Sequence, residues 1–169
     1  MLKKITSFSI IIICLIFSCH TVMAENRFTD NGNGTVTDHK LELMWSKTDN
    51  QVDINWKHAN AWTKYTFEDT ITPKYNNWRL PTLEELQSLF ILDPKYNGYM
   101  TDCGFVAKIT PEIKISCILL WTSEKSIGAR VAFNFNIGSP FAIPAYDING
   151  CRALPVRSLK KDNFQPSKD

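Results

Sequence analysis

The sequence predicts an α+β fold with an N-terminal hairpin, two helices, a long loop and an antiparallel sheet. Three patterns carry this prediction. Turn-forming residues near position 30 separate two β-prone stretches, and apolar residues recur at helical spacing in two later segments. After residue 117, apolar stretches and stretches of alternating apolar and polar residues predict several strands. Because helices and strands occupy separate parts of the chain, the helices are expected to be segregated from the sheet.

Residues 27–47 have the pattern of a β-hairpin. The cluster at residues 30–34 contains only Asp, Asn and Gly, which tolerate positive φ, and it predicts the turn. The strand that follows is expected to be half-buried, because Leu41, Leu43 and Trp45 alternate with other residues. Calcium binding by the cluster is not expected, since glycines stand where an EF-hand loop needs oxygen ligands.

Residues 55–67 predict a first helix, in which apolar side chains recur every three residues along one side. These side chains are Trp56, Ala59, Trp62 and Tyr65. The stripe is interpreted as core packing, with a sugar-stacking role for one tryptophan as the alternative. His58 lies between the stripe positions and is expected to be solvated.

A second helix is predicted to begin at Thr82. Thr82 and Glu85 stand three residues apart and form a capping box, in which each side chain bonds a free backbone N–H at the helix start. Pro81 keeps the incoming chain extended. The predicted buried face consists of Leu83, Leu86, Leu89 and Phe90.

The second half of the chain predicts a loop followed by strands. Residues 93–116 contain proline and glycine without a clean period and predict a long, irregular loop. Strands are predicted at residues 118–123, 129–136 and 153–159, with turns at 138–140 and 147–150. The strand at 129–136 is expected to bury one face, and Pro155 marks the last strand as an edge or bulged position.

Residues 1–24 have the three parts of a cleavable signal peptide. Two lysines precede an apolar run at residues 8–17, and Ala24 ends a site of small or branched residues. A lipoprotein signal that ends at Cys19 and a retained membrane anchor are the alternatives, although the run is short for a span of about 20 residues. The predicted organisation is a signal peptide at 1–24, one domain at 25–159 and a disordered polar tail at 160–169.

Charge and export limit the partners. The 19 basic residues include Lys3 and Lys4, so the exported chain keeps 17 basic and 17 acidic residues and a formal charge of zero. Nucleic acid and anionic membranes are therefore not expected as partners. The expected location is the periplasm, the outer-membrane surface or the medium.

Three cysteines remain after residue 24, namely Cys103, Cys117 and Cys151. In an oxidising compartment two of them are expected to pair, and the sequence allows all three pairings. Cys103–Cys117 is favoured because both flank one loop-rich stretch. The remaining thiol is expected to be buried and inert, with pairing between chains as the alternative. The cysteine and histidine spacings do not predict a zinc site, and no metal or cofactor is expected.

The motifs of this chain resemble those of the Lcl C-terminal domain family, which was first described at the end of a bacterial collagen-like adhesin. The matching stretches, in order, are residues 27–38, 43–45, 78–82 with Glu85, Leu86 and Leu89, 121–123 and 155–157. The resemblance implies a C-type-lectin-like fold, also found in formylglycine-generating enzymes, and some family members bind sulfated glycans. The chain departs from the adhesive archetype because it has no Gly-X-Y stretch and because its exported part carries no net formal charge. The calcium and sugar motifs of classical C-type lectins are also absent.

The resemblance favours a non-catalytic, adhesin-like module that binds a glycan or a cell-surface protein. In this fold, ligands are expected on the loops beside the later strands. There an aromatic ring, amides and a guanidinium suit sugar hydroxyls. The candidate ligand-binding residues are Trp121, Arg130, Asn134, Asn136, Asp147 and Asn149. Each also has a purely structural interpretation, with Trp121 in the core and the others as ordinary strand or loop residues.

Two other classes of function stay open. The chain is also interpreted as a structural or interaction subunit of a cell-envelope assembly, which an exposed apolar patch would favour. An oxidase-like enzyme of the formylglycine-generating type is the third class, and Cys151 beside Arg152 is its one candidate. That chemistry requires an exposed Cys151 with a low pKa.

Overall fold

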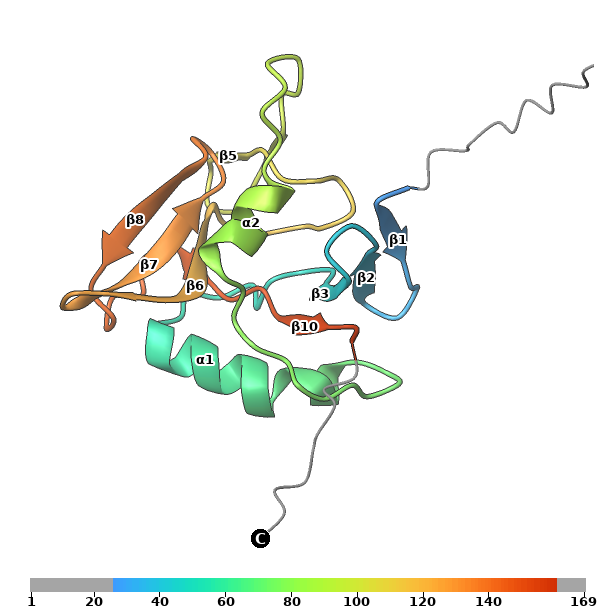
Figure 1. Ribbon diagram of the computed structural model, residues 1–169. Helices are drawn as coiled ribbons and strands as arrows, with labels where there is room; N and C mark the ends of the chain where they lie inside the picture. Colours follow the sequence, from blue (N-terminus) through green and yellow to red (C-terminus); the bar gives the residue numbers. More distant parts are fainter. Residues whose placement is uncertain (1–25, 161–169) are drawn as a thin grey trace, which may run out of the picture.

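The strands from the two ends of the domain share one sheet. A computed structural model describes residues 26–160 (Figure 1). Its first sheet contains β1 (Phe28–Asp30), β2 (Thr35–Asp38), β3 (Leu43–Ser46) and β10 (Val156–Ser158) in the order β1-β2-β3-β10. All neighbours are antiparallel, and Val156 is paired with Trp45.

The predicted hairpin turn forms as the sequence suggests. The carboxylate of Asp30 accepts a hydrogen bond from the Gly32 N–H, and the Asn33 side chain accepts one from the Thr35 N–H. Gly32 and Gly34 both have positive φ, at 72° and 84°. The Asp/Asn/Gly cluster therefore satisfies its own backbone.

The prediction of a half-buried strand after the turn is wrong. Leu41 is exposed, and all four residues of β3 are buried. Trp45 packs in the largest core cluster, whereas Met44 packs on the opposite face against Phe67 and Trp78. Because β3 lies between two strands and has a packed layer on each face, alternation along the sequence does not describe it.

The second sheet has the order β8-β7-β6-β9. Its strands are β6 (Leu119–Ser126), β7 (Ala129–Asn134), β8 (Ser139–Ile143) and β9 (Cys151–Arg152). β6 is central, as predicted, but its pairing with β9 is parallel. β8 begins at Ser139, inside the stretch 138–140 for which a turn is predicted, and its Pro140 is tolerated because β8 is an edge strand.

The two helices cover opposite faces of this second sheet, so they are not confined to one side. Ala132 packs with Ala59 of α1 (Trp56–Tyr65), while its neighbour Phe133 packs with Leu86 of α2 (Leu83–Leu89). In Figure 1, α1 runs below the sheet and α2 lies in front of its upper part. The expectation of one buried face for β7 is therefore wrong at Ala132.

Helix α1 is capped by Asn55, whose side chain accepts a hydrogen bond from the His58 N–H. Ala59 is buried and Trp62 is half-buried, but Tyr65 is 75% exposed. A spacing of three residues falls about 60° short of a full turn at each step, so the predicted stripe winds off the core face by its last member. The stripe prediction is wrong at Tyr65.

Helix α2 begins with the predicted capping box. The Thr82 hydroxyl accepts from the Glu85 N–H at 3.1 Å, and the Glu85 carboxylate accepts from the Thr82 N–H at 2.7 Å. Leu86 and Leu89 are buried. A single turn, η1 (Phe67–Thr70), links α1 to the segment before α2.

The favoured disulfide is confirmed. Cys103 and Cys117 are bonded, with their Cα atoms 5.3 Å apart, and Cys151 is a buried free cysteine. The bond closes a loop that contains β5 (Val106–Ala107), which pairs with β4 (Tyr99–Met100) just before Cys103. Closing a loop of 14 residues stabilises the fold by about 3 kcal/mol.

The expected signal peptide at 1–24, with Cys19, lies outside the described residues, as does the expected tail beyond Lys160. Within residues 26–160, no helix has the length and apolar character needed to cross a bilayer.

The capping box gives a first prediction. Replacing Thr82→Ala removes one cap and is expected to lower the free energy of unfolding by about 1 kcal/mol. Urea denaturation followed by circular dichroism measures the change. Thr66→Ala is the matched control, because Thr66 precedes η1 without a side-chain cap bond, and its effect should stay within about 0.5 kcal/mol. Equal losses in the two variants would contradict this account of α2.

Candidate functional site

Trp121 is removed from the predicted ligand-binding set. Its side chain has no exposed surface, and its indole N–H donates to the Ile54 carbonyl oxygen at 2.7 Å. It packs in a core cluster with Ala59 and Leu80. A ring that is buried on both faces cannot stack on a sugar, so the structural interpretation of Trp121 holds.

The predicted polar residues lie in separate places and support local structure. The Asn134 side chain accepts from the Asn136 N–H at 2.8 Å, and the Asn136 amide donates to the Val106 carbonyl oxygen at 2.8 Å. Asp147 accepts from the Asn149 N–H at 2.9 Å in the loop between β8 and β9. Asn134 and Asp147 are therefore engaged in turns, Asn136 bonds the distant strand β5, and Asn149 stands exposed.

Arg130 lies at the other end of β7 from Asn134. Its guanidinium carbon is 4.6 Å from the ring centroid of Trp56, which is a cation–π contact. A guanidinium N–H of Arg130 also donates to the Ala129 carbonyl oxygen. The backbone N–H of Trp56 donates to the Ala145 carbonyl oxygen, so the loop after β8 also contacts the start of α1. The predicted residues do not form one site.

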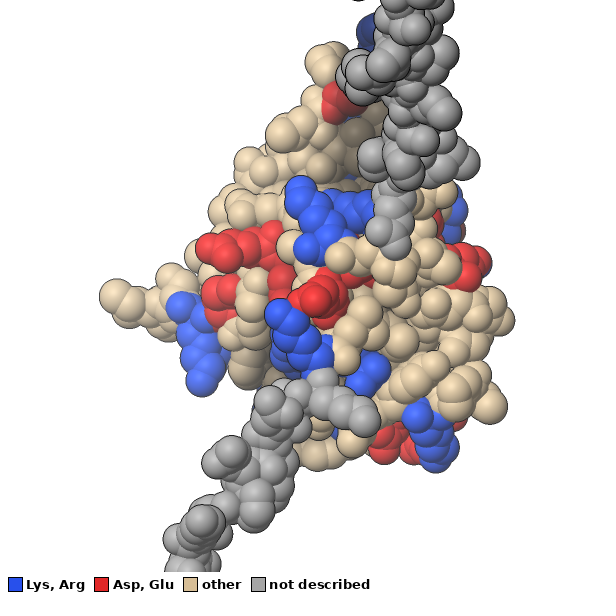
Figure 2. Space-filling view, turned by 45° about the vertical axis from the view of Figure 1, so that its right-hand side comes forward, with Lys and Arg blue, Asp and Glu red and all other residues tan. Residues whose placement is uncertain are grey.

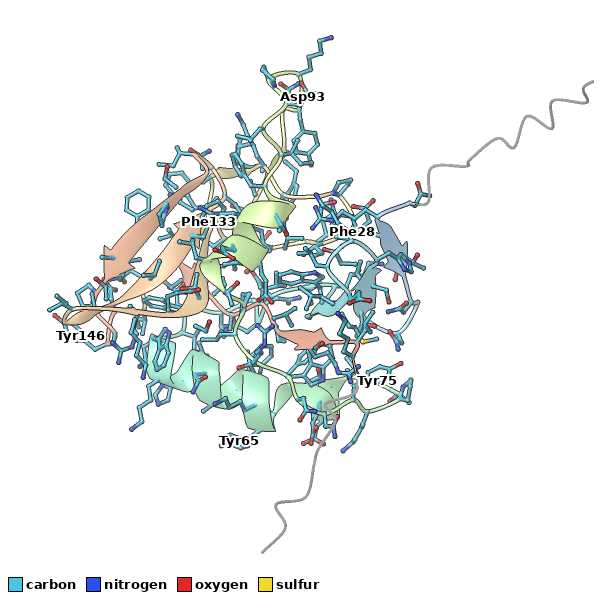
Figure 3. All side chains as sticks on the ribbon, in the orientation of Figure 1. Phe28, Tyr65, Tyr75, Asp93, Phe133 and Tyr146 are labelled. Atoms are coloured by element: carbon cyan, nitrogen blue, oxygen red, sulfur yellow. A yellow bond between two sulfur atoms is a disulfide. The ribbon has the colours of Figure 1, made fainter. Side chains whose placement is uncertain are left out.

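A basic groove lies at the opposite end of α1. It has a volume of about 450 Å³ and takes its walls from the end of α1, from the segment before α2 and from the end of β10. Its lining residues are Lys64, Tyr65, Asn77, Trp78, Arg79, Ser158 and Lys160. Figure 3 shows Tyr65 at the end of α1, pointing away from the core.

Backbone pairing builds this groove. The Arg79 N–H donates to the Val156 carbonyl oxygen at 2.9 Å, and the Val156 N–H donates back at 3.0 Å. Below them Trp78 is buried and packs edge-on against Phe67, with ring centroids 4.7 Å apart. Two sequence motifs far apart in the chain thus form one rigid wall.

The cations of the groove differ in how they are held. Arg79 donates two parallel hydrogen bonds to Glu85, at 2.6 and 2.8 Å, which raise the pKa of the guanidinium. Burial works to raise the pKa of Glu85, but the bonds from Arg79 and Thr82 leave it below its usual value. Lys160 pairs with Glu42, whereas Lys64 has no carboxylate partner among residues 26–160.

The charged surface is mixed in sign. In Figure 2, basic and acidic side chains alternate over the visible face without a large area of one sign. The face seen in Figure 2 therefore carries no extended basic surface.

A second recess, the polar hollow, has a volume of about 240 Å³. It is lined by residues from three segments, 48–51, 99–102 and 114–116. At its base the buried Asp49 carboxylate accepts hydrogen bonds from the N–H and hydroxyl groups of Ser116. Burial raises the pKa of Asp49, and the bonds from Ser116 and Gln51 offset part of that effect.

The remaining cysteine does not resemble a reactive nucleophile. Cys151 has no exposed surface, and burial together with the nearby Asp147 and Asp53 raises the pKa of its thiol to about 12. The neighbouring Arg152 is engaged with Ser116 and Asp53. Within residues 26–160, no three His, Cys, Asp or Glu side chains are grouped to hold a metal ion.

Sequence reasoning missed both recesses. The sequence around residue 82 predicts a helix cap, and the spacing of the first helix predicts a buried Tyr65. Each recess combines segments far apart in the chain, so no local pattern could reveal it. The helical drift of Tyr65 away from the core was the one available signal.

The fold is an α+β module with two helices, mostly antiparallel sheets and a disulfide. The family model of the Lcl C-terminal domain matches residues 34–157, which is more than half of the 169-residue chain. The chain belongs to the Lcl C-terminal domain family, as its motifs predicted. A search of curated proteins finds no match.

The state of Cys151 gives a second prediction. At pH 8 a thiol of pKa about 12 is almost entirely protonated, so native protein should leave Cys151 unmodified by iodoacetamide. Peptide mass spectrometry after short exposure measures the modification, and guanidinium-unfolded protein serves as the reactive control. Rapid labelling of native Cys151 would contradict its burial and favour the enzyme hypothesis.

Proposed function

We propose that the chain is an exported, non-catalytic binding module that recognises a glycan carrying acidic groups through the basic groove. The supporting observation is the exposed ring of Tyr65 among the cations Lys64, Arg79 and Lys160 in one recess. An aromatic face stacks on the apolar side of a sugar ring, and cations beside it bond sulfate or carboxylate substituents.

The form of the groove supports this proposal. Its volume of about 450 Å³ lies within the range of about 300–1,000 Å³ for small-ligand sites. Arg79 is held in place by Glu85 while its side chain stays 37% exposed, so little further side-chain entropy is lost on binding. Lys64 and Lys160 lie on exposed segments and can move to meet a ligand.

The wider assignment follows from the family and the disulfide. We assign a C-type-lectin-like fold, supported by the shared sheet of the first and last strands and by the order of helices, loop and second sheet. The Cys103–Cys117 bond favours an oxidising compartment, in agreement with the predicted signal. The periplasm, the outer-membrane surface and the medium all satisfy this condition.

A second candidate function is the binding of a cell-surface or envelope protein. It is favoured by exposed apolar side chains at the edge of the second sheet and on its neighbouring loops. These side chains are Ile127, Ile137, Phe141, Tyr146 and Ile148. Exposed apolar side chains that gather into one area are typical of protein interaction surfaces.

The third prediction tests the groove. On a glycan array the purified protein should bind sulfated oligosaccharides and lose binding between 50 mM and 500 mM salt, because screening weakens exposed charge pairs. Lys64→Ala should weaken binding about fivefold and Tyr65→Ala about tenfold, as loss of a charged hydrogen bond or a stacked ring implies.

Lys57→Ala is the matched control, since Lys57 is exposed two turns earlier on α1 and lies outside the groove. Lys57→Ala should leave the affinity for the sulfated ligand unchanged. For the desulfated ligand, Lys64→Ala and the unchanged protein should bind equally well. Absence of binding to any glycan, or full affinity in Tyr65→Ala, would refute the proposed function and direct attention to the apolar edge.

A further inference from the structure

We propose that the polar hollow is a second ligand site, which takes a single uncharged sugar residue. It lies apart from the basic groove, and the two recesses share no lining residue. The inference goes beyond the proposed function, because the hollow would bind its ligand whether or not the groove binds one.

The walls of the hollow are fixed before any ligand arrives. The Cys103–Cys117 disulfide joins the segment at 99–103 to the segment at 114–117, and the Cys103 N–H donates to the Ser116 carbonyl oxygen at 3.3 Å. The hydroxyl of Tyr99 accepts from the Ile115 N–H at 2.6 Å and donates to the Ile115 carbonyl oxygen at 3.2 Å. A preformed recess lowers the entropy lost on binding.

The base of the hollow is also fixed. Asp49 binds Ser116 through two hydrogen bonds and the Gln51 N–H through a third, at 2.9 Å. The Ser116 hydroxyl in turn accepts from the Arg152 guanidinium at 2.9 Å. This buried network satisfies its own members, so it supports the recess and leaves recognition to the side chains at the rim.

The rim side chains match a polyol better than an ion. Asp102 supplies an acceptor and Lys114 a donor of opposite charge, while Gln51 and Thr48 each supply both. The Lys114 ammonium lies 4.3 Å from the ring centroid of Tyr99, which holds it at the hollow. The lining carboxylates Asp49 and Asp102 face two cations, Arg152 behind the base and Lys114 at the rim, so the charges of the hollow are mixed. An ionic ligand needs an excess of one sign, whereas sugar hydroxyls need donors and acceptors together.

The size of the hollow agrees with this choice. Its volume of about 240 Å³ corresponds to roughly eight water molecules at about 30 Å³ each. That is room for one sugar ring. The exposed thioether of Met100 offers an apolar contact for the C–H face of such a ring.

The fourth prediction is a titration of the isotope-labelled protein with methyl glycosides of glucose, galactose and N-acetylglucosamine, followed by backbone amide NMR. At least one of them should produce saturable shifts at residues 48–51, 99–102 and 114–116, with a dissociation constant in the millimolar range. Lys114→Ala and Asp102→Asn should each weaken that binding about fivefold. Lys95→Ala, an exposed lysine outside the hollow, should not change it.

Two results would overturn the inference. One is the absence of saturable shifts with all three glycosides at concentrations up to about 100 mM, well above the expected millimolar dissociation constant. The other is a set of shifts confined to residues 64–65, 77–79 and 158–160, which would support the groove alone. Failure of the proposed function appears instead as lost binding of sulfated ligands, so each failure has its own readout.

Discussion

The bridge between Arg79 and Val156 is the contact on which the rest of the arrangement depends. It consists of two backbone hydrogen bonds, and Val156 simultaneously pairs with Trp45 of β3. The segment before α2 is thereby fixed to the strand that closes the first sheet. The same segment carries Trp78, which packs against Phe67, and Arg79, which lines the basic groove together with the ends of α1 and β10.

Local signals predicted the parts of the fold that depend on local chemistry. The capping box of Thr82 and Glu85 and the turn at residues 30–34 form as expected, because their hydrogen bonds join residues two or three positions apart. The disulfide was favoured on similar grounds, from two cysteines that flank one loop. Such short-range interactions are specified by the residues of the same local segment, so the sequence of that segment is enough to predict them.

Predictions failed where burial depends on distant layers. β3 and β7 are buried on both faces because separate clusters pack on each side, and alternation along a strand cannot reveal a second layer. The candidate site failed for the same reason. Trp121 is enclosed by α1, and the residues that line the two recesses come from segments that only the fold brings together.

Hydrogen–deuterium exchange of the whole chain, with and without a sulfated oligosaccharide, tests the central claim that the basic groove is the binding site. Ligand in the groove should slow exchange in three segments, namely the end of α1 near Tyr65, residues 76–80 and the end of β10. Slowed exchange confined to β7 and the loop at residues 144–150, with the groove unchanged, would contradict the account and return the site to the later strands.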